Sequence, residues 1–539
     1  MKVQRIELRN KSNFMIDYLS SNERVMEYYE YHPHDDFEKR LQELQGHSFK
    51  REELAKILHI ANKKWGAKQE TFQNIERLKD ERSVVVVGGQ QAGLLTGPLY
   101  TLNKIISILK LAKEQEETLK VPVIPVFWIA GEDHDFAEIN HVHLLQERKI
   151  KKHQIEQYVS ERTPVSDISL DKQKAKKWLD AIFIELQETV HTKPLYRLVK
   201  DSLSKSETYV DFFAQIIHEI FAGEGLVLFN SQDPAVRELE RDYFTKLITH
   251  QPAISKSIYQ TAHKVRQTGY DLTIEPEETD AHLFYHLNGE RILLSRNEDN
   301  NFSGLEGEIE LTEAELLQIA KSSPELLSNN VVTRPIMQDL LFPTLAFIGG
   351  WGEINYWSVL KGAYQELQRK MPPVVPRLSF TFLQPKIEKL LDKYSLQVEK
   401  VINEGVSKER INWLSSQPAY PNAILVEQIK EDMASIHEPL RKMAEKISPN
   451  LKELSETNID YIQNKIDFLV RSIERELEHK QKHILKDFYI IEHCLFPDQQ
   501  LQERIMNPIY LLNDFGQTFI NKLIKEEISF QNEHYVVIL

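Results

Sequence analysis

Residues 83–97 read SVVVVGGQQAGLLTG, and residues 121–135 read VPVIPVFWIAGEDHD. Each segment contains an apolar run of strand length, and continuous runs of this kind are typical of strands buried on both faces of a parallel sheet. Between them, Pro98 would lie in the first turn of a helix that continues to Lys113, where the missing N–H of proline costs nothing. Strand, helix and strand form a βαβ unit, whose right-handed crossover brings both strand ends to one edge of the sheet. The sequence therefore predicts an α/β protein built on a parallel sheet.

The alternation of apolar runs and helical patterns continues to residue 380, so we expect one core over residues 1–380 with inserted connecting segments. Helical patterns dominate one insertion, at about 150–222, and a small β-rich insertion is expected at about 270–310. Further strands of this region are predicted at 225–230, 281–285 and 291–294.

After residue 380 the pattern becomes helical. Apolar residues recur at spacings of three and four, as in a heptad repeat. The first seam is Ile429, Met433, Ile436, Leu440, Met443 and Ile447, and the second is Ile459, Ile462, Ile466, Leu469, Ile473, Leu477 and Ile484. Both seams are too narrow for helices that are buried all round. We therefore predict a helical coiled-coil arm over residues 381–495, with a packed bundle as the alternative, and a C-terminal segment over 496–539 that returns to the core.

The composition argues against several classes of protein. The chain carries a net charge of -14, whereas a nucleic-acid-binding protein needs a cationic face, so we expect no nucleic-acid partner. The single cysteine, Cys494, excludes an intramolecular disulfide and a multi-cysteine zinc site. The charged first residues do not resemble a signal peptide, and no apolar run is long enough to span a membrane. We therefore expect a cytoplasmic protein without a membrane partner.

The first strand end is rich in glycine and glutamine. Ligands of open α/β sheets bind beyond the carboxyl ends of the strands, and glycine lets a ligand approach the backbone closely. The segment matches neither a P-loop nor the G-x-G-x-x-G pattern, so a tight structural turn is an equal alternative. The substrate-binding candidates of this strand, the next strand and the intervening helix are Gln90, Gln91, Gly93, Tyr100, Asn103, Lys104 and Trp128.

The second strand end carries Glu132, Asp133, His134 and Asp135. Three carboxylates and an imidazole directly after a buried strand cost free energy of desolvation unless a ligand compensates for it. They could bind a substrate ammonium group, hold a magnesium ion through water, or supply a general base that deprotonates an attacking amine, and we take them as the catalytic candidates. The alternative is a solvated loop that caps the next helix. No zinc-ligand pattern is present, so we assign no metal ligand.

A third cluster contains Arg334, Gln338, Glu353 and Tyr356. Arg334 could bind a carboxylate or phosphate through two of its guanidinium nitrogens. Glu353 and Tyr356 would share one face of a helix. A tightly packed aromatic corner would explain the nearby tryptophans but not these polar residues together, so we expect them to bind substrate.

Three motifs, in this order, resemble the BshC family of cysteine ligases of bacillithiol biosynthesis. They are VVGGQQAGLLTGPLYT at 86–101, PVFWIAGEDHD at 125–135 and RPIMQD at 334–339. The resemblance spans essentially the whole chain. It implies a Rossmann-like core with inserted connecting segments and a helical coiled coil that forms a homodimer. The implied reaction joins the carboxylate of L-cysteine to the amine of glucosaminyl-malate and gives bacillithiol.

The implied reaction needs an activated carboxylate, because an amide does not form from a carboxylate and an amine at neutral pH. We therefore expect ATP or ADP as the nucleotide, with magnesium as an optional ion. The resemblance also implies a relation to the class I nucleotidyl-transferring synthetases, but the sequence contains neither their His-Ile-Gly-His nor their Lys-Met-Ser-Lys-Ser motif. A nucleotide could instead contact Arg504, Asn507 and Tyr510, near the return to the core. Two other function classes remain open: a metal-dependent hydrolase that uses the acidic cluster at 132–138, and a non-catalytic scaffold built around the arm.

Overall fold

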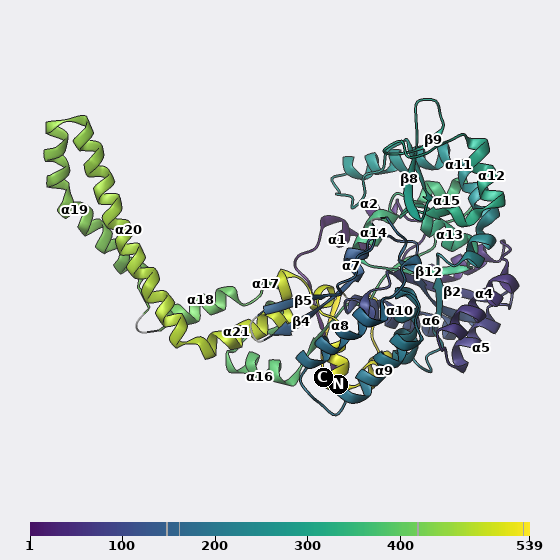
Figure 1. The fold of residues 1–539 in the computed structure, drawn as a ribbon, viewed down its shortest axis with the longest axis horizontal. Coiled ribbons are helices and arrows are strands. Elements are labelled where there is room, and N and C mark those ends of the chain that lie inside the picture. The colour runs from purple at the N-terminus through teal and green to yellow at the C-terminus, as the bar shows by residue number, and fades with distance from the viewer. Residues whose placement is uncertain (147–148, 161, 418–419, 532) are drawn as a thin grey trace. The chain divides into compact units, whose positions relative to one another are not determined.

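The computed structural model describes residues 1–539 apart from 147–148, 161, 418–419 and 532 (Figure 1). The chain divides into two compact units. Unit 1 consists of Met1–Leu144, Lys151–Leu383 and Gln502–Leu539, and unit 2 consists of Leu145–Ile150 and Gln384–Leu501.

The centre of unit 1 is a parallel sheet, as the sequence predicts. The described residues form five strands in the order β13-β12-β2-β3-β6, and every neighbouring pair is parallel. The two strands of the predicted βαβ unit are neighbours, with Val84 opposite Val123 and Gln90 opposite Ile129. The strands are β2 (Val84–Gln90), β3 (Val123–Ile129), β6 (Val227–Asn230), β12 (Thr344–Gly349) and β13 (Val374–Pro376).

Both faces of this sheet are covered by helices. Val85 and Val87 join a buried cluster that contains side chains of α4 (Arg51–Lys64) and α5 (Gln69–Arg77). On the other face of β2, a Cβ atom on Gly88 would lie 3.1 Å from Ile108 of α6 (Tyr100–Leu119). Successive side chains therefore enter two different apolar layers, which explains why the run at 84–87 is apolar without interruption.

The segment between β2 and α6 is a tight turn. Gly97 has a φ of 71°, and Leu95 and Thr96 also have positive φ values, of 48° and 75°. A Cβ atom on Gly93 would lie 2.7 Å from the Cα of Gly97, closer than any side chain allows. These glycines therefore close the turn, which is the structural role considered for them as an alternative to ligand binding.

Two insertions extend the core. Between residues 150 and 222 lie α8 (Lys172–Glu185), α9 (Thr192–Lys205) and α10 (Tyr209–Ile220), but the segment starts in a strand, β5 (Lys149–Gln154), rather than in a helix. The β-rich insertion continues beyond residue 310 to Asn329, with strand order β10-β9-β8-β7-β11. Its strands are β7 (Asp280–Leu287), β8 (Glu290–Arg296), β9 (Phe302–Gly304), β10 (Glu310–Leu311) and β11 (Leu327–Asn329).

A separate three-stranded sheet joins the two ends of the chain. β15 (His534–Ile538) lies between β1 (Lys2–Ile6), to which it is antiparallel, and β14 (Phe380–Leu383), to which it is parallel.

The remaining strand β4 (His141–Gln146) pairs with β5. Further elements of unit 1 are the helices α1 (Asn13–Leu19), α2 (Glu23–Met26), α3 (Phe37–Leu44), α7 (Phe136–Ile139), α11 (Pro234–Gln267), α12 (Glu313–Ser322), α13 (Thr333–Leu341), α14 (Trp351–Trp357), α15 (Lys361–Glu366), α22 (Gln502–Ile505), α23 (Ile509–Phe515) and α24 (Thr518–Lys525).

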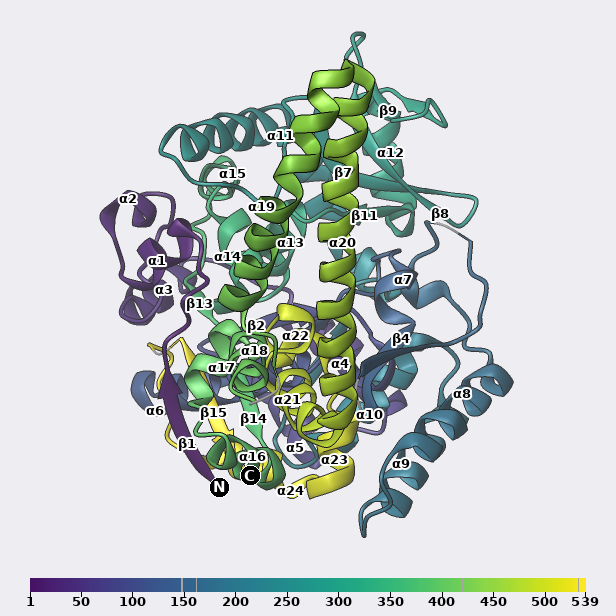
Figure 2. The same cartoon turned by 90° about the vertical axis from the view of Figure 1, so that its left-hand side faces the viewer.

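Unit 2 is helical from Gln384 onward and contains the predicted coiled coil. α19 and α20 lie side by side as an antiparallel pair (Figure 2). Ser448 caps α20 by accepting a hydrogen bond from the backbone N–H of Leu451, and Pro449 lies in the first turn, where its missing N–H costs nothing. The helices are α16 (Pro385–Lys393), α17 (Val398–Glu404), α18 (Ser407–Ser415), α19 (Ala423–Ile447), α20 (Pro449–Lys480) and α21 (Lys482–Leu495).

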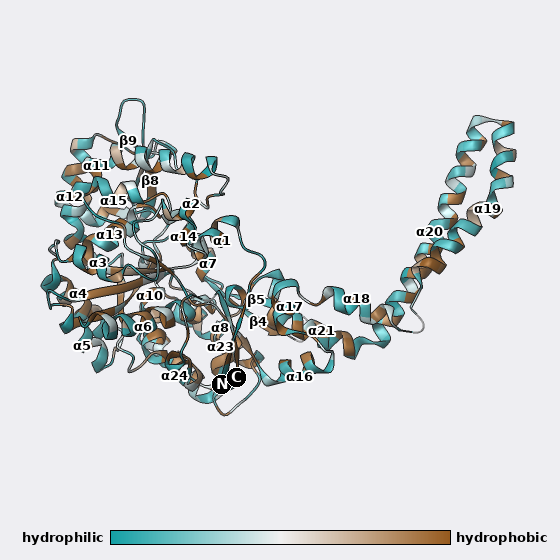
Figure 3. Cartoon of the chain, turned by 180° about the vertical axis from the view of Figure 1, so that it is seen from behind, coloured by the Kyte–Doolittle hydropathy of each residue, from teal (hydrophilic) through white to brown (hydrophobic). Residues whose placement is uncertain are grey.

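Much of the apolar seam of this pair is exposed in the single chain. Ile436 is 73% exposed and Ile447 is 70% exposed, whereas Ile459 is 6% exposed. In Figure 3 the two helices are hydrophilic over most of their length, with hydrophobic residues interspersed. No described helix combines the length and the apolar character that crossing a membrane would require.

Candidate active site

The carboxyl ends of the parallel strands carry the predicted polar residues. β2 ends at Gln90, the acidic cluster at 132–135 follows β3, and Glu353 lies in the first turn of α14, just after β12. Arg377 directly follows β13. Because the strands are parallel, these positions lie along one edge of the sheet, where ligands of such folds bind.

Lys104 is buried and connects two of the predicted clusters. Its Nζ atom donates to the carbonyl oxygen of Gly89 at 2.7 Å and to the carboxylate of Glu353 at 2.5 Å. The same Glu353 oxygen accepts the backbone N–H of Gly350 at 2.8 Å. Burial lowers the pKa of Lys104, and the charge of Glu353 opposes this shift. The ion pair therefore holds β2, α6 and α14 together at the strand ends.

Arg334 and Gln338 lie one turn apart on α13 and have unsatisfied polar atoms. Arg334 Nη2 donates to the hydroxyl oxygen of Tyr356 at 2.6 Å. Within the described residues, Arg334 Nε and Gln338 Oε1 are buried without a hydrogen-bond partner. Burial alone would lower the pKa of Arg334, but Tyr356, Glu353 and Glu132 raise it, so the guanidinium stays charged. A half-buried guanidinium with an unpaired N–H is suited to an anionic ligand, and the unpaired amide oxygen of Gln338 is suited to a hydrogen-bond donor of the same ligand.

Asp133 is half-buried and ionised. Gln91 Nε2 donates to its Oδ2 atom at 2.7 Å, and the backbone N–H of His134 donates to Oδ1 at 2.7 Å. Burial would raise the pKa of Asp133, but the Gln91 amide, the charge of Arg291 and the backbone N–H groups outweigh it and hold the pKa below the ordinary value. Its carboxylate is therefore negative at neutral pH and still reachable from solvent.

Glu132 and Asp135, two of the four predicted catalytic residues, make contacts that stabilise the fold. Arg237 of α11 donates to Glu132 and, at 2.6 Å, to Glu240, and these three residues are at most 3% exposed. Asp135 accepts the backbone N–H of Glu138 at 3.3 Å and caps α7. The loop therefore has the helix-capping function that the sequence offered as an alternative, and a catalytic role for Glu132 and Asp135 stays a prediction.

The acidic cluster does not converge on a common point. Glu132 faces Arg237, Asp135 faces the start of α7, and Asp133 faces Gln91. Over the part of the chain that the structure describes, no group of three or more His, Cys, Asp or Glu side chains is placed to hold a metal ion. A metal-dependent hydrolase would need several of these side chains to face one ion, so the geometry gives this alternative no support.

Arg291, which the sequence did not single out, contacts His134. It lies on β8 of the β-rich insertion, and its Nη1 atom is 3.3 Å from His134 Nδ1. Burial lowers the pKa of His134, and the charge of Arg291 lowers it further. Burial also lowers the pKa of Arg291, to about 10, which still leaves it charged at neutral pH.

Asn103 belongs to a buried cluster with two further residues that the sequence did not reveal. Arg377 donates to both carboxylate oxygens of Glu503, at 2.6 and 2.8 Å, and Asn103 Nδ2 donates to Glu503 at 2.6 Å. The guanidinium of Arg377 lies 5.9 Å from the ring centre of Tyr100. Arg377 ends the proline-rich stretch MPPVVPR at 371–377, which is a local signal for extended backbone but not for an ion pair, and no local pattern marks Glu503.

The three nucleotide-binding candidates have different surroundings. Asn507 is buried, and its amide donates to three carbonyl oxygens of the turn at 94–97 and accepts the backbone N–H of Ile509. This amide is committed to holding the turn and does not fit a nucleotide contact. Arg504 is exposed, and its charge acts on Tyr100, so its guanidinium is available to a phosphate. Tyr510 is half-buried on α23.

Trp128 lies in the core rather than on the surface of the site. Its ring is 0% exposed, and its centre lies 4.3 Å from the centre of the Phe229 ring.

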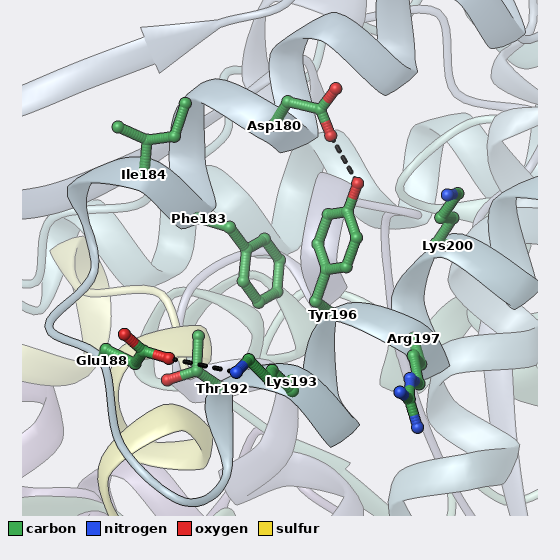
Figure 4. A pocket seen from close by; sticks show the side chains of 9 residues that line it. All are labelled: Asp180, Phe183, Ile184, Glu188, Thr192, Lys193, Tyr196, Arg197 and Lys200. Atoms are coloured by element: carbon green, nitrogen blue, oxygen red, sulfur yellow. Dashed lines mark hydrogen bonds and ion pairs between the residues drawn. The ribbon is translucent and has the colours of Figure 1, made fainter.

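A cavity of about 690 Å³ between α8 and α9 is lined by residues outside the predicted site (Figure 4). There Asp180 accepts a hydrogen bond from Tyr196 at 2.6 Å, and Lys193 pairs with Glu188 at 3.6 Å. Lys193 and Glu188 are 81% and 75% exposed, so this cavity is an open surface feature without a buried polar centre.

Comparison with known proteins identifies the family. The model described as "Bacillithiol biosynthesis BshC, N-terminal Rossmann-like domain" matches residues 1–378, and the model of the C-terminal coiled-coil domain of the same family matches residues 380–539. The chain belongs to the BshC family. A relative from Oceanobacillus iheyensis is 39% identical and one from Bacillus licheniformis is 40% identical, each over the full length of both chains. Both are named "Putative cysteine ligase BshC".

Family membership agrees with the architecture. The Rossmann-like domain of the family ends at residue 378 in this chain, between β13 and β14, and the coiled-coil domain starts at residue 380. The three motifs that resembled the family all lie within the first match, and they supply the strand ends and helix α13 of the candidate site.

Proposed function

We propose that this chain is a cytoplasmic ligase that joins the carboxylate of L-cysteine to the amine of glucosaminyl-malate, with a nucleotide as the source of activation. The names of the relatives support the cysteine ligase activity, and the description of the family supports a place in bacillithiol biosynthesis. The observation that carries the proposal is the ionised, reachable Asp133 beside the cationic groups of Arg291 and Arg334.

Both proposed substrates carry charges that match this set of residues. L-Cysteine has an ammonium group and a carboxylate, and glucosaminyl-malate has an amine and two carboxylates. Asp133 would attract an ammonium group or an amine, and Arg334, with its unpartnered Nε atom, would bind a carboxylate. The unpartnered amide oxygen of Gln338 would accept a hydrogen bond from a substrate ammonium or amine group. The edge of the sheet therefore offers complementary charges to a carboxylate and an amine that must be held together.

A bound nucleotide would supply the leaving group that makes the cysteine carboxylate reactive. Of the three candidates, Arg504 is suited to pairing with its phosphates, and Asn507 instead maintains the turn next to the site. Magnesium would accompany the phosphates as their counter-ion. Removal of a proton from the attacking amine would fall to Asp133 or His134, because Glu132 is committed to a buried ion pair and the exposed Asp135 caps α7.

We also propose that the coiled coil of unit 2 pairs two copies of the chain. Ile436, Leu440, Met443 and Ile447 of α19 are each more than 60% exposed although they form one apolar seam. Two antiparallel helices do not bury such a seam, whereas the equivalent seam of a second copy would cover it in a bundle.

The proposal is tested by incubating the purified full-length chain with L-cysteine, glucosaminyl-malate, ATP and Mg²⁺, and by measuring bacillithiol by mass spectrometry. We expect bacillithiol that depends on the protein and on ATP. Omitting ATP and replacing it by ADP are the matched controls that identify the nucleotide. An absence of bacillithiol under all these conditions, with a protein that melts cooperatively, would contradict the proposal.

A further inference from the structure

Arg291 is held on three sides, so that one nitrogen points at His134. Its Nε atom donates to Ser328 Oγ at 3.1 Å, and Nη2 donates to the carbonyl oxygen of Asn329. The guanidinium carbon lies 3.7 Å from the centre of the Phe284 ring, which supports the flat face of the group. With Nε and Nη2 committed in this way, Nη1 faces His134 Nδ1 at 3.3 Å.

The contact with arginine determines which ring nitrogen of His134 carries the proton. A guanidinium group has only donors, so Nδ1 of His134 must act as the acceptor and carry no proton. The remaining ring proton of a neutral imidazole is then on Nε2. Among the described residues, Nε2 has no hydrogen-bond partner, and the ring is half-buried. A neutral ring with Nε2–H has a hydrogen-bond donor to offer and no free lone pair with which to accept a proton.

We propose that Arg291 is a positioning residue that fixes His134 as the neutral Nε2–H form, so that His134 donates a hydrogen bond to the reacting carboxyl oxygen of the cysteine substrate and Asp133 accepts the amine proton. The inference rests on the proposed ligase function and assigns roles within the same site. In the step, the amine nitrogen bonds to the carboxyl carbon, and the bond from that carbon to the nucleotide-derived leaving group breaks. The leaving group takes the electron pair, Asp133 takes one amine proton, and His134 keeps its Nε2 proton.

Several charged groups surround the ring and favour this assignment. Arg291 and Arg162 disfavour a second positive charge on His134, whereas Asp133 and Asp135 favour one. Burial and Arg291 outweigh the carboxylates, so the pKa of His134 lies below its ordinary value and the ring is neutral at physiological pH. Negative charge grows on the carboxyl oxygen as the amine attacks, and a fixed donor at that oxygen stabilises the transition state.

Two replacements of His134 distinguish a role as hydrogen-bond donor from a role as general base. His134→Gln places an amide nitrogen near the position of Nε2, and His134→Asn places one near Nδ1. We expect His134→Gln to keep kcat/KM within about tenfold of wild type, and His134→Asn to lose about 10²–10³-fold, as when one donor to a developing oxyanion is removed. Equal losses of 10²-fold or more in both variants, with unchanged melting temperatures, would show that the ring acts as a base and would overturn the inference.

The role of Arg291 is tested by combining it with the histidine variant. Arg291→Met is expected to lower kcat/KM in the wild type but to have little further effect in His134→Gln, because Arg291 acts through His134. Purely structural effects of the two changes would add, and additive losses would overturn the positioning role. Arg296→Met is the matched control, because Arg296 lies on the same strand, stacks 4.3 Å from the centre of the Phe302 ring and does not contact the site.

A readout without substrates keeps this inference distinct from the proposed function. The full-length protein is labelled with ¹⁵N-histidine, and the His134→Gln variant identifies the ring signals of residue 134. We expect a protonated Nε2 and an unprotonated Nδ1 at neutral pH in wild type. Wild type that makes no bacillithiol but shows this ring state contradicts the ligase function alone. A proton on Nδ1 contradicts the role of Arg291, whatever the reaction.

Discussion

Replacing Glu503 by glutamine is expected to destabilise unit 1 by about 3–5 kcal/mol, the usual cost of breaking a buried ion pair. Glu503 accepts three hydrogen bonds, from Arg377 at 2.6 and 2.8 Å and from Asn103 at 2.6 Å. The side chain of Glu503 is 2% exposed and that of Arg377 is 12% exposed, so water cannot replace these contacts. In Glu503→Gln, an NH₂ group takes the place of one oxygen and faces a donor of Arg377 or Asn103.

The free energy of unfolding is measured by urea titration, followed by the fluorescence of the buried tryptophans of unit 1. Glu527→Gln is the matched control: this carboxylate is exposed, and its loss should change stability by no more than about 0.5 kcal/mol. The double variant Arg377→Met with Glu503→Leu should be more stable than Glu503→Gln, because it leaves no buried charge unpaired. A Glu503→Gln midpoint equal to that of wild type at the same m value would refute this reasoning.

Three further predictions follow from the site, the coiled coil and the buried histidines. Asp133→Asn should lower bacillithiol formation by about 10²–10⁴-fold with an unchanged melting temperature, since it removes the proposed base; activity within threefold of wild type would reject that role. Changing Ile436 and Leu440 together to lysine should convert dimers to monomers in sedimentation velocity, because each change places a charge in the apolar seam. His534 has its pKa lowered to about 4 by burial, so its contribution to stability should be lost as the pH falls from about 6.5 to about 4, by up to about 3 kcal/mol, and His534→Gln should show a flatter pH dependence of the urea midpoint.

The sequence predicts the core of the fold because the relevant signals are local. The run at 84–87 is apolar without a break, and in the structure both faces of this strand are covered. The uninterrupted pattern therefore predicts an apolar layer on each face of the sheet. The Ser448-Pro449 pair likewise identifies a helix start, because a cap and a first-turn proline act within a few residues. By contrast, β1 has a polar and mostly exposed sequence, and only its pairing with β15 at the other end of the chain makes it a strand.

The candidate site shows the same division between local and distant signals. Gln91 and Asp133 were found because they follow strands, and Lys104 because it lies at the start of the helix after β2; their partners at the sheet edge are also predicted residues or nearby backbone. Arg237 and Arg291 were missed because they reach Glu132 and His134 from other elements, across 105 and 157 positions of sequence. A long-range ion pair leaves no periodicity in either segment. The identity of a buried partner therefore comes from the fold alone.

The pairing of β1 with β15 has a consequence for biosynthesis of the chain. The backbone N–H of Leu8 bonds to the carboxylate of Glu533, 525 positions later in the sequence, so this sheet cannot close on the ribosome until the final segment has emerged. Contacts of such high sequence separation slow folding, because a long loop must be closed before they form. Since Lys2 lies opposite Ile538, a short linker can join the two ends. A circular permutant made in this way, with new ends in an exposed loop of the arm, turns the most distant contact into a local hairpin and should refold faster than the natural chain order.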